Sequence, residues 1–67
     1  MNRDQLIREL RRYANTNGLE FELDKKRGNG SHYQVRVGSE RTIIAHEIDP
    51  FRRMKILKQL KIDPTNL

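Results

Sequence analysis

Residues 30–46, GSHYQVRVGSERTIIAH, decide the fold, because they contain two short apolar runs separated by a glycine turn. Tyr33, Val35 and Val37 alternate with polar residues, which is the pattern of a strand with one buried face. A Gly-Ser-Glu turn at 38–40 and a second apolar run at 41–45 follow. The stretch therefore predicts an antiparallel hairpin.

The register of this hairpin decides which side chains meet. A three-residue loop at 38–40 would place Val35 opposite Ile43 and His32 opposite His46. A two-residue loop is less favourable, because it would move Ile43 to the polar face of the sheet. Directly opposed residues have Cβ atoms about 5 Å apart. We therefore expect the two imidazoles to lie side by side.

A further strand and a helix are predicted before the hairpin. Leu19, Phe21 and Leu23 repeat the strand alternation. Asn2 and Gln5 have the spacing of a helix capping box, and the helix is expected to stop near residues 15–17. Gly18 is then free to take the left-handed conformation that ends many helices. Its apolar residues at helical spacing are Leu6, Ile7, Leu10, Tyr13 and Ala14.

A second helix is predicted after the hairpin. Asp49-Pro50 is a favourable helix start, and Asp63-Pro64 is expected to end it. The apolar side is expected to contain Met54, Ile56, Leu57 and Leu60, with Arg52, Lys55 and Lys58 on the other side. Phe51, like Phe21, is expected in the core.

The order of these elements predicts an α+β fold over a single domain, residues 1–67. Helix, three strands and helix give an α-β-β-β-α chain with a three-stranded antiparallel sheet. Both helices are expected on one face of that sheet.

The residue composition and the net charge exclude several kinds of protein and favour one kind of partner. The 67 residues contain no cysteine, which excludes disulfides and thiolate metal sites. The sequence has no apolar run long enough for a signal peptide or a membrane span, so a cytoplasmic protein is expected. The net charge of +5 favours a polyanionic partner such as RNA.

The triplet Gly30-Ser31-His32 is the strongest candidate for a functional motif. Glycine lets a ligand approach the backbone, serine adds a hydroxyl, and the pKa of an imidazole lies near neutrality. RNA cleavage needs a proton removed from a 2′-hydroxyl and a proton given to the 5′ oxygen, and imidazoles can do both. His32 and His46 are therefore the candidate catalytic residues. The candidate RNA-binding residues are Lys25, Lys26, Arg27, Gly30, Ser31, Arg36, Lys55 and Lys58.

A metal site is the weaker alternative. His32, His46, Glu47 and Asp49 could offer nitrogen and oxygen ligands, but their spacing matches no recognised zinc site. The sequence also lacks a phosphate-binding loop and a dinucleotide glycine pattern. We therefore expect no metal and no small-molecule cofactor.

Nearly the whole chain resembles the HicA toxins of HicA/HicB toxin–antitoxin modules. The likeness rests on the first helix, Gly18, the triplet at 30–32, His46 and the closing stretch at 54–60. The resemblance implies a fold like the double-stranded RNA-binding domain and activity as a messenger RNA interferase, a stress-response endoribonuclease, with His32 catalytic. It also implies a HicB-like antitoxin as protein partner.

Two other functions fit the same residues. One is a non-catalytic RNA-binding module of the same fold, which would grip RNA whether or not His32 is present. The other is an interaction domain whose basic surface meets an acidic protein.

Overall fold

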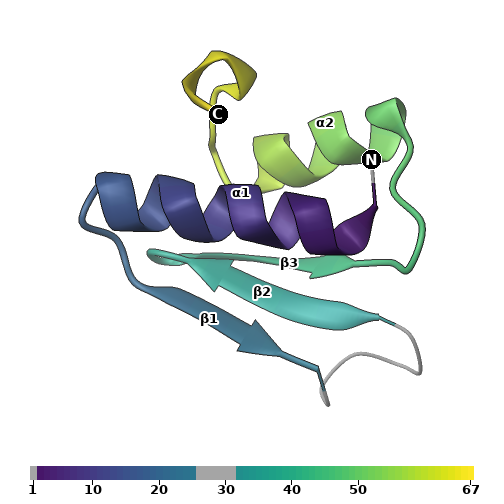
Figure 1. Cartoon of the computed structure of the whole chain (residues 1–67), viewed down its shortest axis with the longest axis horizontal. Helices are drawn as coiled ribbons and strands as arrows, with labels where there is room; N and C mark the ends of the chain where they lie inside the picture. Colours follow the sequence, from purple (N-terminus) through teal and green to yellow (C-terminus); the bar gives the residue numbers. More distant parts are fainter. Residues whose placement is uncertain (1, 26–31) are drawn as a thin grey trace.

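The computed structural model describes residues 2–25 and 32–67. The elements follow in the order α1 (Arg3–Thr16), β1 (Phe21–Asp24), β2 (Tyr33–Val37), β3 (Glu40–Ile44), α2 (Pro50–Gln59) and a 3₁₀ turn, η1 (Pro64–Asn66). The strands form one antiparallel sheet in the order β1-β2-β3. Both helices lie over the same face of it (Figure 1), with α1 against β1 and β2 and α2 against β3. The predicted α+β fold is confirmed.

Both helices start where the sequence predicts. The Asn2 side chain accepts a hydrogen bond from the Gln5 amide at 2.8 Å, and the Gln5 side chain accepts one from the Asn2 amide at 3.1 Å. Asp49 caps α2 by accepting a hydrogen bond from the Arg52 amide at 2.7 Å, with Pro50 in the first turn. These bonds satisfy backbone donors that a helix start otherwise leaves unpaired.

Both helices end in the same backbone motif but with different residues. After α1, Gly18 has a φ of +67°, and the Leu19 amide donates to the Ala14 carbonyl at 2.8 Å. After α2, Lys61 has a φ of +59°, and the Ile62 amide donates to the Leu57 carbonyl at 2.8 Å. The predicted end of α2 at Asp63 is wrong, because the helix ends at Gln59, four residues earlier, and the left-handed residue Lys61 follows its cap.

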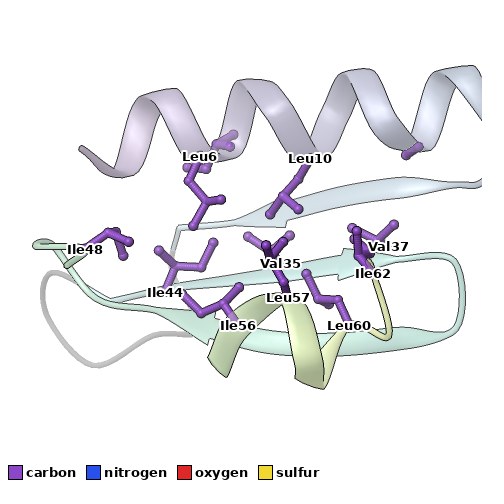
Figure 2. Packing of buried hydrophobic residues seen from close by; sticks show 12 residues of the cluster. Leu6, Leu10, Val35, Val37, Ile44, Ile48, Ile56, Leu57, Leu60 and Ile62 are labelled. Atoms are coloured by element: carbon purple, nitrogen blue, oxygen red, sulfur yellow. The ribbon is translucent and has the colours of Figure 1, made fainter. Parts of the chain in front are cut away.

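The core lies between the helices and the inner face of the sheet. Leu6 and Leu10 of α1 lie above Val35 and Ile44 of the sheet, and Leu57 comes from α2 (Figure 2). All five are fully buried. An ion pair of 3.2 Å between Glu9 of α1 and Arg53 of α2 joins the two helices.

The predicted register of the β2–β3 hairpin is wrong. Val35 pairs with Thr42 and Val37 pairs with Glu40, so the loop contains only the two residues 38–39. Gly38 has a φ of +63°, which suits the first position of a two-residue hairpin turn.

Thr42 explains why this register is tolerated. Its side chain lies on the inner face with a residue exposure of 5%, and its hydroxyl donates a hydrogen bond to the side-chain oxygen of Gln59 in α2. A buried hydroxyl with a partner costs little free energy. Ile43 lies on the outer face instead and is 57% exposed.

Three apolar residues expected inside are exposed. Phe51 is 72% exposed and Met54 52%, because the face of α2 that meets the core is formed by Ile56 and Leu57. Leu19 is 41% exposed, because β1 begins only at Phe21. The helical spacing predicted for α2 is therefore confirmed, but the side of the helix that faces the core is narrower than predicted.

Candidate functional site

The candidate site lies at the end of the sheet where β2 begins and β3 ends. Both helices start at this end (Figure 1). An isolated antiparallel bridge between Asn2 and Glu47 holds the start of α1 against the segment that leads from β3 into α2. Residues distant in sequence thus meet around the start of β2.

His32 is an exposed residue directly before β2. Because Tyr33 and Val35 face the core and side chains alternate along a strand, the same alternation places His32 on the outer face with Gln34. An exposed imidazole beside a strand is accessible to a ligand.

Two cations meet at the residue next to His32. The Arg3 guanidinium carbon lies 3.6 Å from the centre of the Tyr33 ring, and the Lys25 Nζ lies 5.6 Å from it. Such cation–π contacts attract a charged side chain to the face of the ring and stabilise its position there. Lys25 was a predicted site residue, whereas Arg3 was not, since no spacing in the sequence relates the first turn of α1 to β2.

His46 does not lie opposite His32. In the observed register Tyr33 pairs with Ile44, so continuing it by one residue puts Ala45, not His46, across from His32. His46 is an exposed residue in a bend after β3. The expected pairing of the two imidazoles is wrong, because it depended on the three-residue loop.

His46 lines an open groove of about 530 Å³ between the starts of the two helices. The other lining residues are Asn2, Arg3, Asp4, Glu47, Ile48, Asp49 and Arg52. Arg3 therefore contacts Tyr33 beside His32 and also borders the groove of His46.

The groove is mixed in charge, with the carboxylates of Asp4, Glu47 and Asp49 beside two arginines. Asp49 is engaged as the cap of α2 and lies 3.8 Å from the Arg52 Nε. Among the described residues, no three histidine or carboxylate side chains are grouped as metal ligands would be.

Arg36, a predicted RNA-binding residue, is held by carboxylates on the outer face. It lies 2.9 Å from Glu22 and 3.0 Å from Glu20, and it donates a hydrogen bond of 2.5 Å to the Gly38 carbonyl. The hydrogen bonds that the Arg36 guanidinium donates to Glu22 and Glu20 raise its pKa above the usual value. A phosphate would have to compete with both carboxylates for this arginine.

Lys55 and Lys58 are exposed on α2, as predicted, but they border an apolar groove of about 480 Å³. The Lys55 Nζ lies 5.7 Å from the centre of the exposed Phe51 ring. The groove is completed by Met54, Leu57, Ile62 and Pro64. The remaining predicted site residues, Lys26, Arg27, Gly30 and Ser31, lie outside the described residues.

Sequence analysis missed three arginines on α1. Arg8, Arg11 and Arg12 line a groove of about 510 Å³ beside β1. Their spacing places them on neighbouring turns of one helix, and this signal was present in the sequence.

None of the helices in the described part of the chain has both the length and the apolar character of a membrane span. Comparison with protein-family models, with characterised proteins and with solved structures finds no match to this chain.

Proposed function

We propose that the protein is a cytoplasmic, metal-independent endoribonuclease that cleaves messenger RNA, with His32 as its general acid or base. In this proposal it is the HicA-like toxin of a toxin–antitoxin pair, and a HicB-like antitoxin binds it. The observation that carries the proposal is the exposed His32 next to Tyr33, where Arg3 and Lys25 converge from two other elements. RNA cleavage needs a group that transfers protons and cations that stabilise charge, and His32, Arg3 and Lys25 are of these two kinds.

The proposed reaction uses these groups in order. His32 removes the proton from a 2′-hydroxyl, and the 2′ oxygen attacks the neighbouring phosphorus. Arg3 and Lys25 stabilise the negative charge that develops on the phosphoryl oxygens. The bond to the 5′ oxygen breaks, and this oxygen takes up a proton, which leaves a 2′,3′-cyclic phosphate and a 5′-hydroxyl. His46 is the candidate donor of that second proton.

The test compares His32→Ala and His46→Ala with the unaltered protein in a cleavage assay on messenger RNA in the presence of a chelator. Loss of a positioned acid or base lowers the rate by roughly a hundredfold to ten-thousandfold, and we expect this for His32→Ala. His46→Ala is expected to have a smaller effect, because the register separates it from His32.

Growth provides the second readout. Expression of the protein without its antitoxin is expected to arrest growth, and His32→Ala is expected to relieve the arrest. Because His32 is exposed, its loss should change the free energy of unfolding by less than about 0.5 kcal/mol. A folded His32→Ala protein that cleaves RNA at the full rate would refute the catalytic role.

The second candidate is a non-catalytic RNA-binding module. The exposed, cationic outer side of α2, with Lys55 and Lys58, favours it. In that case the unaltered protein binds RNA without cleaving it, and His32→Ala leaves the affinity unchanged.

A further inference from the structure

The groove between α1 and β1 is lined by Arg8, Arg11, Arg12, Asn15, Leu19 and Phe21. None of these residues is acidic. This composition sets it apart from the groove of His46, which contains three carboxylates, and from the outer sheet face, where Glu20 and Glu22 hold Arg36. Of these surfaces, the groove beside α1 has the most strongly positive lining.

Arg8, Arg11 and Arg12 are not engaged in ion pairs within the described part of the chain. Arg8 and Arg12 are four residues apart on α1, a spacing at which like charges repel each other. Bound phosphates would relieve this repulsion.

The same groove offers surface for a nucleobase. Leu19 is exposed, and the Arg11 guanidinium carbon lies 5.3 Å from the centre of the Phe21 ring. Planar guanidinium groups stack on aromatic rings and bind phosphate through two hydrogen bonds. Apolar and planar groups between cations are typical of surfaces that bind single strands, whereas a duplex hides its bases.

The two elements that line the groove also lead to the candidate site. Helix α1 begins at Arg3, which lies on Tyr33, and β1 leads to Lys25, which approaches the same ring. Arg12 lies nine positions after Arg3, which is about 14 Å along a helix.

We propose that the α1–β1 groove binds single-stranded RNA and leads it to His32, with phosphates on Arg8 and Arg12 and a base against Leu19. The inference rests on the proposed function, because it identifies the path of the substrate. It adds that RNA contacts are made by α1 rather than by the outer sheet face.

The experiment measures RNA binding in the His32→Ala background, so that cleavage does not enter the result. A short fluorescein-labelled single-stranded RNA is titrated by anisotropy at several salt concentrations. Each phosphate contact to a single strand contributes roughly −0.7 to the slope of log K against log salt. Arg8→Gln/Arg12→Gln should therefore reduce the slope by about 1.4, which is roughly 25-fold in affinity near 0.1 M salt.

Two further double variants serve as controls. Arg41→Gln/Lys61→Gln removes the same charge from exposed positions outside the groove and should leave the slope nearly unchanged. Arg8→Lys/Arg12→Lys keeps both charges on α1 and should keep the slope. Independently of any substitution, amide shifts in the unaltered groove should respond to added RNA.

The proposal is overturned by an unchanged slope for Arg8→Gln/Arg12→Gln, by tighter binding of an RNA duplex than of the single strand, or by no binding at all. A larger loss for Lys55→Gln/Lys58→Gln than for the α1 pair would also overturn it and would place the RNA on α2. If the unaltered protein binds as expected but does not cleave, the catalytic proposal fails while the binding groove stands.

Discussion

The hairpin register can be tested with two adjacent isoleucines. Ile44 is fully buried between the sheet and the helices, whereas Ile43 is 57% exposed on the outer face. A shift of the register by one residue would exchange their environments. Truncating each in turn therefore reports which one faces the core.

The expected costs differ clearly. Replacing a buried isoleucine by valine costs about 0.5–1.5 kcal/mol and by alanine about 2–5 kcal/mol, because a cavity forms. Substitutions of exposed residues usually change the free energy of unfolding by less than about 0.5 kcal/mol. The free energy of unfolding of the whole domain is expected to be only about 3–10 kcal/mol, at roughly 0.05–0.15 kcal/mol per residue. Ile44→Ala should therefore remove much of the stability, and Ile44→Val provides a variant that stays folded.

The assay is thermal and urea unfolding followed by circular dichroism. One kcal/mol shifts the Tm of a domain of this size by about 4–8 °C. Ile44→Val should lower the Tm by about 2–12 °C, and Ile43→Val should lower it less. Ile43→Ala should stay folded. Equal losses for the two positions, or a larger loss at Ile43, would refute the observed register and return His46 to a place opposite His32.

Further predictions concern the helix ends and the last turn. Gly18→Ala should destabilise the protein by roughly 1 kcal/mol, whereas Lys61→Gly should stabilise it by a similar amount, because both positions have positive φ; urea midpoints that move the same way for both would contradict this. Asn2→Ala and Asp49→Ala should each cost about 1 kcal/mol in thermal unfolding through loss of a cap, and unchanged Tm values would argue against the caps. Hydrogen bonds from the Thr65 amide and hydroxyl lower the pKa of Asp63 below its usual 3.8. A carboxyl with a lowered pKa stabilises the folded form above its usual pKa and loses this effect as the pH falls through the lowered value. The Thr65 amide signal should therefore titrate with a midpoint below 3.8, and a midpoint at or above that value would contradict the assignment.

Some features of the candidate site could be predicted from the sequence, and others could not. The position of His32 before β2 follows from alternation alone, and Lys25 follows from its place after β1. The contact of Arg3 with Tyr33 joins residues from α1 and β2, which no local pattern connects. Likewise, the ion pairs of Arg36 with Glu20 and Glu22 form only because β1 pairs with β2.

The sequence by itself determined the two α-helices and three strands, their order and the caps at the starts of both helices. Periodicity and capping are local properties, since they depend on residues within a few positions of one another. The caps at Asn2 and Asp49 and the left-handed Gly18 show this directly.

Only the tertiary structure decided the hairpin register and the separation of the two histidines. Alternation fixes which residues share a face within one strand, but not which residues of two strands face each other. Here Gly38 suits the two-residue turn, and Gln59 of α2 accepts the hydrogen bond of Thr42, so a polar residue enters the core while Ile43 stays outside. A partner from a distant helix thus reversed the burial order that hydrophobicity alone predicts, because a satisfied hydroxyl costs little to bury.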